Sequence, residues 1–517
     1  MPATQDNRPI RIDTPLGKDA ILLKELTVEE ELGRPFLITA NLRSEGPEPV
    51  DPTRLVNQSV TITINLKDGN KRYFNGIVSR FSMIGTKDSY EFWKYSIEIV
   101  PAFALLRHTT DCRLFIQKSN TEIVMQLLKE HDIKYDDDSL HDFDITYEPR
   151  ELAVQYRKST FDFISRLLEN EGVYYHFKHS EEDHVMEFND TSPSDHHLFS
   201  ETANAIPYIT DINHDEAIHA WEVVTCVGSN TSALSDYDYT KPKVNLLTSE
   251  LAPPSKFSLF DAPGLYYAAD SDPIEYGAYY AKIRLEEQVC RQRLYKGSGP
   301  LLNLGVGYIF KPLGTYKDEE CLTIRMILKL ETPEWTSTES NDIGMSVVCD
   351  FEAIPKDVYF RPARITPKPL VSGVLSAVVV GPEGQDPMLP YTNELGCVKV
   401  QFHWDRYGNK DENSSTWIRV GQFAAGKNWG SMFIPRIGDE VLVAFEAGNP
   451  NRPYVITSLY NALNTPSMPL PEQSQVSYFV DDGGNGIWFK PVQGNECIKL
   501  FSTYENTTRI MGDISSM

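Results

Sequence analysis

Paired cysteines are missing from this sequence. Its seven cysteines are scattered and form no C-x-x-C pair, which argues against a disulfide framework and against a zinc site. We therefore expect reduced, mostly buried thiols. No run of about 18 apolar residues occurs, so no segment is expected to span a membrane. Residues 1–8 lack the apolar core of a secretory signal, so we expect assembly in a cytoplasm and export only by a machine that carries the protein across the envelope.

Basic residues are fewer than acidic ones. The sequence has 49 Lys and Arg against 73 Asp and Glu, a formal net charge of −24. Such a surface repels nucleic-acid phosphates and anionic lipids, so we expect no nucleic-acid partner. The hydrophobic content of 41% and charged content of 24% are typical of globular proteins. At about 100–200 residues per domain, the length predicts three or four domains.

Motifs of common enzymes are also missing. No G-x-S-x-G elbow occurs, and Gly305-x-Gly307 lacks the third glycine of a dinucleotide-binding loop. Asp439 and Glu440 are adjacent, so on a strand they point to opposite faces and do not form a catalytic pair. A turn that leads into a strand is the simpler interpretation. We expect no catalytic residue and no cofactor.

Histidines near acidic residues are candidate metal ligands. They form three groups: His176, His179 and His184; His196 and His197; His214 and His219. The first group lies beside the acidic run at 181–183, but its order is not that of a metal-binding H-E-x-x-H helix, and it is typical of a hairpin. The acidic run at 136–138 lacks the spacing of a calcium loop. We expect no metal site.

Residues 1–115 are expected to form a β domain. Val60, Ile62 and Ile64 alternate with polar residues, which predicts a half-buried strand. A turn is expected at 68–70 because its glycine tolerates positive φ.

Residues 116–184 are expected to form a helical and mixed insertion. Ser119 and Glu122 fit a capping box at the start of one helix. Ser159 is expected to begin a second helix, and Gly172 to end it.

Residues 185–356 are expected to return to β structure, with one helix at 275–296 that Gly297 stops. No sequence repeat relates this region to residues 1–115.

Prolines divide the C-terminal third of the chain. Pro-rich linkers are expected at 357–370 and 463–476. Between them, residues 371–462 predict about five short strands, which fit a small barrel such as the OB-fold. The second linker is too short to hold a lysozyme domain. Residues 477–517 are a Gly-rich, β-like tail, in which the glycines at 483–486 are interpreted as a turn.

Four motifs in the barrel region carry a family resemblance: GCVKVQFHWD at 396–405, WIRVGQ at 417–422, FIPRIGDEVLV at 433–443 and GNPNRP at 448–453. This series resembles the spike-base OB domain of the VgrG family, the tip proteins of type VI secretion systems, which are similar to contractile phage tail hub–spike proteins. The resemblance extends, more weakly, over nearly the whole chain. It identifies structural motif residues, namely Phe402, Trp404, Asp405, Trp417, Arg419, Pro435 and Gly438.

The resemblance implies a mainly β (α+β) protein with two β-barrel tube domains, the OB barrel and the start of a trimeric β-helical needle. Three chains would present a pseudo-sixfold ring. The expected needle core is Ile487, Phe489, Ile498 and Leu500. Only a few strands fit after Pro471, so we expect a short needle or a truncated tail. The chain departs from the family at Cys397, where Arg is usual, and at Asn449 and Asn451, where Asp is usual.

The implied function is mechanical. A homotrimer would cap a hexameric tube protein, contact baseplate proteins, carry a PAAR-repeat tip protein with effectors or their adaptor chaperones, and meet a membrane only by puncture. The alternatives are the hub of a phage tail or of an extracellular contractile particle, a cell-wall hydrolase, and a free-standing binding module.

Overall fold

A computed structural model describes residues 3–6, 8–85, 87, 92–140, 147–190, 205–211, 216–252, 257–264, 273–315, 317–333, 344–494 and 496–503. The chain divides into two units, Met1–Lys368 and Pro369–Met517, and the division falls within the Pro-rich segment 357–370. Strands predominate in both units, and the described residues hold three α-helices, all in the first unit. The mainly β fold is therefore as the sequence predicts.

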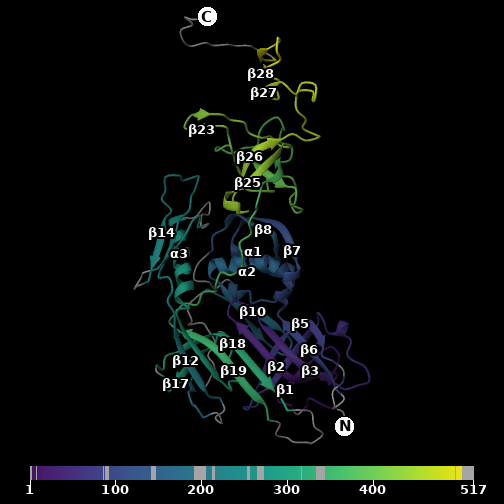
Figure 1. The fold of residues 1–517 in the computed structure, drawn as a ribbon, viewed down its shortest axis with the longest axis vertical. Coiled ribbons are helices and arrows are strands. Elements are labelled where there is room, and N and C mark those ends of the chain that lie inside the picture. Colours follow the sequence, from purple (N-terminus) through teal and green to yellow (C-terminus); the bar gives the residue numbers. More distant parts are fainter. Residues whose placement is uncertain are drawn as a thin grey trace. The chain divides into compact units, whose positions relative to one another are not determined.

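A twelve-stranded sheet frames the first unit (Figure 1). Ten strands follow one another in it: β1 (Ile10–Asp13), β4 (Ser59–Asn65), β5 (Lys71–Met83), β6 (Trp93–Val100), β3 (Leu37–Ser44), β2 (Leu22–Glu31), β18 (Cys321–Glu331), β19 (Ser346–Pro355), β16 (Arg293–Gly299) and β12 (Ala220–Thr225). β17 (Ile309–Leu313) joins at β18, and β11 (Ala205–Pro207) joins at β17. Because β2 pairs with β18, strands from residues 1–115 and 185–356 share one sheet.

Strand β4 follows the predicted alternation but is covered on both faces. Ile62 and Ile64 are buried in the core, and Thr61 and Thr63 on the other face are buried as well. A hairpin of β9 (Tyr174–His179) and β10 (His184–Asn189) contributes to this cover. The Thr61 hydroxyl donates to the carbonyl of Glu181, which lies between these strands, at 2.9 Å. The prediction of a half-buried strand was wrong because the covering hairpin is distant in sequence.

The first two helices begin as predicted, and the second also ends where predicted. α1 (Asn120–Glu130) has the capping box of Ser119 and Glu122. It belongs to a region that also contains the paired strands β7 (Thr110–Lys118) and β8 (Arg150–Ser159). α2 (Thr160–Glu171) starts at the N-cap Ser159 and ends at Gly172, whose φ of 73° is left-handed. Left-handed backbone favours glycine, which explains the helix end.

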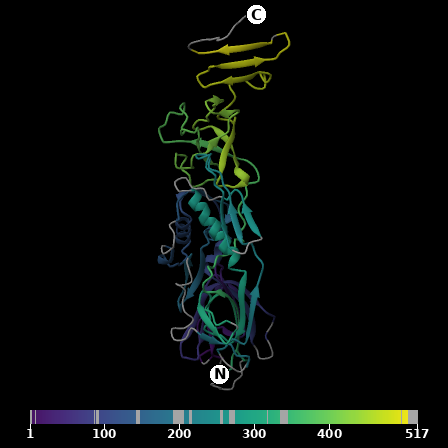
Figure 2. The same ribbon diagram turned by 90° about the vertical axis from the view of Figure 1, so that its left-hand side faces the viewer.

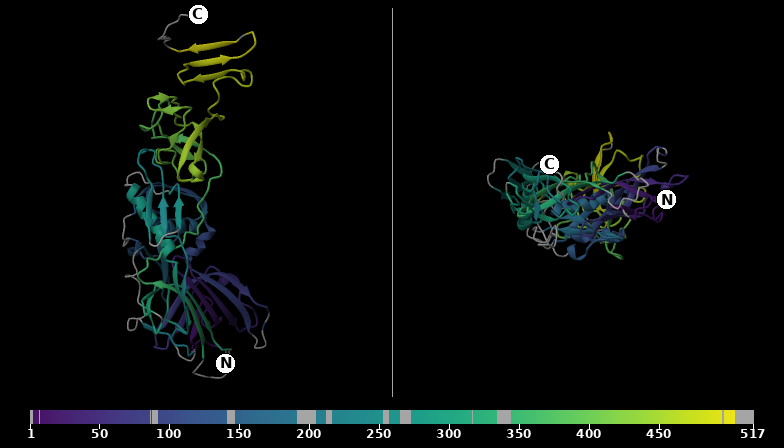
Figure 3. Two further views of the ribbon diagram at one scale, coloured as in Figure 1. Left: turned by 60° about the vertical axis from the view of Figure 1, so that its left-hand side comes forward. Right: turned by 90° about the horizontal axis from the view of Figure 1, so that it is seen from below.

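The third helix ends earlier than predicted. α3 (Pro273–Val289) stops before Gly297, which lies inside β16. A Cβ on Gly297 would lie 2.2 Å from the ring of Phe351 on the neighbouring strand. This glycine therefore makes room for a ring from across the sheet. α3 itself packs on a small sheet of β13 (Thr231–Leu234), β14 (Thr248–Leu251) and β15 (Ser258–Asp261) (Figure 3).

The segment 360–366 is bound tightly to the first unit. The side chain of Arg361 is buried and donates to Glu286 at 2.8 Å. Arg364 donates to Glu287 at 2.7 Å, and the amide of Thr366 donates to Glu169 at 3.0 Å. These contacts attach the segment to α2 and α3.

Among its described residues, the second unit contains a five-stranded sheet and two smaller ones. The larger sheet has the order β21 (Lys399–Phe402), β20 (Leu375–Val380), β25 (Glu440–Phe445), β26 (Pro453–Leu459) and β22 (Arg419–Val420). β23 (Ala425–Gly426) and β24 (Trp429–Gly430) form a short hairpin. In the tail, β27 (Ser477–Val480), β28 (Gly486–Lys490) and β29 (Cys497–Phe501) form an antiparallel meander (Figure 2).

Candidate functional surfaces

The motif residues at the end of β21 hold a turn together. Phe402 is buried and stacks on Trp404, with ring centroids 5.1 Å apart. Asp405 is also buried, and its carboxylate accepts hydrogen bonds from the amides of Tyr407 and Gly408, at 3.0 Å and 3.2 Å. These contacts stabilise the turn that follows β21.

The other motif residues are distributed around the five-stranded sheet. Trp417 lies against Tyr391, with ring centroids 5.0 Å apart. Pro435 is buried, whereas Arg419 is exposed on β22. Gly438 has a φ of 94° in the turn that leads into β25. Trp404 thus stacks on a ring of this chain, and Trp417 contacts another ring at a tilt of 38°.

Asp439 and Glu440 have different partners, as their adjacency predicts. The Asp439 carboxylate accepts from the amide of Arg436 at 2.9 Å and so closes the turn. Glu440 accepts from the side chain of Asn461 at 2.9 Å.

One face of the tail sheet is apolar. The register sets Ile487 opposite both Phe479 and Leu500, and Phe489 opposite Ile498. Directly opposed side chains share a face of an antiparallel sheet, and so do residues two apart on one strand. The expected needle-core residues therefore lie together, with Phe479 added. In a single chain Ile498 is 70% exposed and Leu500 62% exposed.

An aromatic cluster connects the tail sheet to the barrel loops. Phe479 contacts Phe423 and Phe433, with ring centroids 6.4 Å and 6.1 Å away. Phe423 is 83% exposed, and an ion pair of Arg436 with Asp482 also joins the two parts. Sequence analysis missed this cluster because Phe423 and Phe433 lie in loops without strand alternation, far in sequence from Phe479 on β27. Single exposed phenylalanines between glycines were the available signal.

The histidines of the β9–β10 hairpin have separate partners. His176 lies 3.2 Å from Glu187, and His179 lies 3.5 Å from Glu30. His184 accepts from the amide of Ala102 at 3.0 Å, and burial, with the neighbouring His179, lowers its pKa to about 4. The described residues include no group of three His, Cys, Asp or Glu side chains placed to hold a metal ion. His196, His197 and His214 lie outside the described residues.

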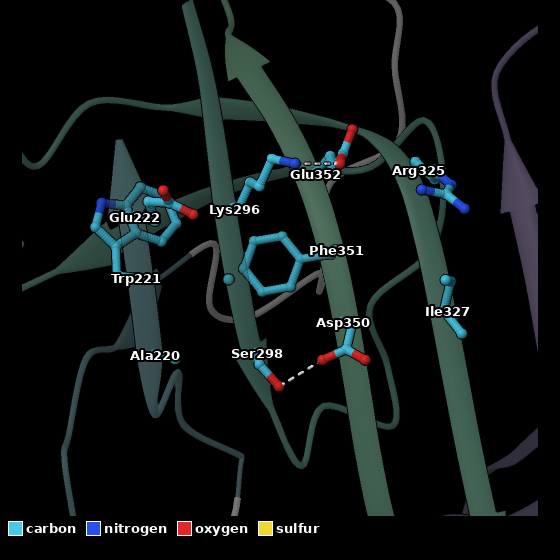
Figure 4. A pocket seen from close by; sticks show the side chains of 11 residues that line it. Ala220, Trp221, Glu222, Lys296, Ser298, Arg325, Ile327, Asp350, Phe351 and Glu352 are labelled. Atoms are coloured by element: carbon cyan, nitrogen blue, oxygen red, sulfur yellow. Dashed lines mark hydrogen bonds and ion pairs between the residues drawn. The ribbon is translucent and has the colours of Figure 1, made fainter. Parts of the chain in front are cut away.

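A pocket of about 310 Å³ lies over β12, β16, β19 and β18 (Figure 4). Lys296 lies 3.0 Å from Glu352, and the hydroxyl of Ser298 donates to Asp350 at 2.7 Å. Cross-strand pairs of opposite charge stabilise a sheet surface. Four of the polar side chains that line this pocket are thus engaged in two pairs, which favours a structural role.

Glu171 is the centre of a buried polar network that sequence analysis did not find. Its carboxylate accepts from Arg150 at 3.0 Å and from the hydroxyl of Tyr280 at 2.7 Å. Burial disfavours the charged form of Arg150, but the nearby Tyr280 and Glu171 raise the pKa of Arg150 above its ordinary value. The three side chains come from α2, β8 and α3, so the network joins elements that are far apart in sequence.

In the described part of the chain, no helix is long and apolar enough to cross a membrane.

Two family models match the chain. The phage tail baseplate hub (GPD) model covers residues 29–326, and the type VI secretion system/phage-baseplate injector OB domain model covers residues 378–460. The long sheet falls largely within the first match, and the five-stranded sheet largely within the second. The fold and these matches define a hub protein of the phage-tail type.

Similar proteins of known family identify the family within this class. The chain is 34% identical over 490 residues to the type VI secretion system spike protein VgrG1b of Pseudomonas aeruginosa, and 35% identical over 483 residues to VgrG1a of the same organism. Each match covers 92% of this chain, but 63% of the first relative and 72% of the second. The chain belongs to the VgrG family of type VI secretion spike proteins. Another relative, the actin cross-linking toxin VgrG1 of Vibrio cholerae, is 31% identical over 448 residues, which are 39% of its length.

Solved structures share the fold. An E. coli protein, described as a type VI secretion component with structural similarity to the T4 bacteriophage tail proteins gp27 and gp5, matches with a TM-score of 0.60 and 18% identity. This match covers 87% of this chain and 100% of that one. A chain of a Francisella PdpA–VgrG complex matches with a TM-score of 0.63 and 11% identity, over 96% of this chain and 77% of that one.

Proposed function

We propose that three copies of this chain form the spike at the tip of a type VI secretion tube. In this proposal the first unit supplies the two tube-type domains of each chain, and three chains cap the hexameric tube protein. The second unit supplies the OB barrel and the start of the needle. The spike contacts the baseplate, carries a PAAR-repeat tip protein and effectors or their adaptors, and crosses the target membrane by puncture. The chain itself acts as a mechanical part and not as an enzyme.

The apolar face of the tail sheet carries this proposal. Phe479, Ile487, Phe489, Ile498 and Leu500 share that face, and large apolar residues in contact with water are unfavourable by about 25 cal/mol per Å². Three such sheets that meet around an axis would bury them. Three strands are at the lower limit for an independently stable sheet, and a trimer would supply a second layer over the apolar face.

The solution mass of the purified chain tests the proposal. Light scattering should give three times the chain mass of 58.7 kDa. The double variant Ile498→Asp with Leu500→Asp places charges on the apolar face and should shift the mass toward that of a single chain. Lys499→Asp, on the opposite face of the same strand, should leave the trimer intact. A wild-type chain that is monomeric or dimeric at micromolar concentration would contradict the proposal.

A further inference from the structure

Four basic side chains meet where α2, α3 and the last residues of the first unit come together. Arg166 lies on α2, one turn before Asn170, and Arg284 of α3 donates to the backbone and side-chain oxygens of this asparagine at 3.1 Å and 2.8 Å. Arg364 and Lys368 follow near the end of the unit. Burial lowers the pKa of this lysine, and the charges of the three arginines lower it further. These four residues therefore form one basic cluster.

The carboxylates around the basic cluster already have cationic partners. Glu287 accepts from the side chain of Arg364 at 2.7 Å, and Glu169 accepts from Arg34 at 2.7 Å. Asp261 lies 4.0 Å from the ammonium group of the lysine. Among the described residues, no carboxylate forms an ion pair with either of the two arginines on α2 and α3. The cluster thus has two guanidinium groups without a counter-charge.

Burial makes these two charges unfavourable. Arg284 is 5% exposed, and its hydrogen bonds go to the neutral oxygens of Asn170. Burial lowers the pKa of Arg284 to about 10, and the nearby Arg364 adds to this effect. Burial also lowers the pKa of Arg166 to about 10. Both side chains stay charged at neutral pH, and a buried charge needs a partner of opposite sign to be stable.

The cluster can be reached from solvent. Arg166 is partly exposed, lies over the ring of Phe163 at 5.3 Å, and makes no hydrogen bond or ion pair with a described residue. The side chains of Arg364 and Lys368 are 29% and 52% exposed. A small ligand can therefore contact several donors of the cluster at once.

We propose that the basic cluster binds the phosphate group of a small molecule. A phosphate group carries about −1.5 to −2 charges at neutral pH, which matches the two guanidinium groups without a carboxylate. The planar guanidinium fork also fits phosphate oxygens. The net charge of −24 disfavours an anion elsewhere on the chain. The bound phosphate joins α2, α3 and the end of the first unit, and this binding does not depend on the proposed trimer.

Titration of the purified full chain with inorganic phosphate tests the site. Calorimetry at neutral pH in about 0.15 M sodium chloride suppresses weak binding to the surface. We expect one phosphate per chain, with a dissociation constant no higher than about 1 mM, because several charged hydrogen bonds form.

Arg166→Gln removes one guanidinium group and should raise the dissociation constant at least about tenfold. Without phosphate its thermal midpoint should equal or exceed that of the wild type, because an unpaired buried charge is lost. Saturating phosphate should then raise the midpoint of the wild type and not that of the variant. The control Arg54→Gln makes the same change in net charge at an exposed site and should bind phosphate as the wild type does.

A second titration with adenosine triphosphate identifies the source of the phosphate group. Displacement of inorganic phosphate by a lower concentration of the nucleotide would assign the site to a phosphate ester. Binding of inorganic phosphate alone would assign it to the free ion.

The two variants decide the outcome. Saturable binding to the wild type and to Arg54→Gln, together with weak binding to Arg166→Gln, supports the site. The absence of saturable binding of either ligand to the wild type overturns it, as it would if carboxylates of another copy neutralised the cluster. Equal binding to the wild type and to Arg166→Gln also overturns it.

Discussion

Tyr280 of α3 places its hydroxyl 2.8 Å and 2.7 Å from the two carboxylate oxygens of Glu171 of α2, in the interior of the first unit. Burial, followed by the charge of Glu171, raises the pKa of Tyr280 well above its ordinary value. The hydroxyl therefore remains a donor to Glu171 at any physiological pH.

Tyr280→Phe removes this donor and should lower the free energy of unfolding by about 1–3 kcal/mol. Glu171→Ala should cost more, about 3–5 kcal/mol, because it leaves the buried charge of Arg150 without its main counter-charge. Urea unfolding measures both. Lys356→Ala at a half-exposed ion pair is the control, with an expected change within about 0.5 kcal/mol. Equal losses in all three variants would contradict a central role for Glu171.

His184 should make the first unit sensitive to acid. Burial lowers the pKa of this imidazole from 6.5 to about 4, so the folded state prefers it neutral. The free energy of unfolding is therefore unaffected by this group above pH 6.5. As the pH falls from 6.5 toward 4, the unfolded chain binds the proton first, and the free energy of unfolding decreases by about 1.4 kcal/mol per pH unit. Urea midpoints at pH 7 and pH 5 measure this loss. His184→Gln does not titrate and should flatten the dependence. An unchanged slope in that variant would assign the effect to other groups.

Gly297→Ala should destabilise the sheet. The added Cβ would lie 2.2 Å from the ring of Phe351, and overpacking of this kind costs about 1–3 kcal/mol. Gly344→Ala, where no atom lies within 4 Å of the added carbon, is the matched control and should be neutral or slightly stabilising. The two thermal midpoints should therefore move apart, and a coincident shift would contradict the steric explanation.

Asp405→Ala should loosen the turn after β21. It removes the acceptor of the Tyr407 and Gly408 amides, at a cost of about 1–2 kcal/mol. Asp405→Asn keeps an acceptor oxygen and should recover most of the loss. Amide hydrogen exchange at residues 407–408 measures the change directly. Fast exchange in both variants would show that charge, and not only an acceptor, is required.

Local features of this fold could be predicted from the sequence. The capping box at Ser119 and the left-handed end at Gly172 depend on residues within one turn, so a short window contains all the information. The strand at Val60, Ile62 and Ile64 was found for the same reason. The prediction that Gly297 ends a helix was wrong because the partner of that glycine, Phe351, lies in another strand.

The candidate surfaces likewise include features that could be predicted from the sequence and features that could not. Ile487, Phe489, Ile498 and Leu500, which were expected as a needle core with the family resemblance, share one face of the tail sheet. Two features could not be predicted in this way because they depend on contacts between distant segments. They are the contact of Phe479 with the barrel loops and the Glu171 network. The long sheet repeats one strand order, in β5–β6–β3–β2 and again in β18–β19–β16–β12, although no repeat is visible in the sequence.

Segment 360–366 has a mechanical consequence. A pull on the chain beyond residue 368 reaches this segment before it reaches β19, which ends at Pro355. The tension is then taken up by Arg361, Arg364 and Thr366 on the two helices. Ion pairs and hydrogen bonds on separate helices share that load, so the force does not act first on β19, which lies between β18 and β16 in the sheet. The connection between the units thus transfers a pulling force to the helices before the force reaches the sheet.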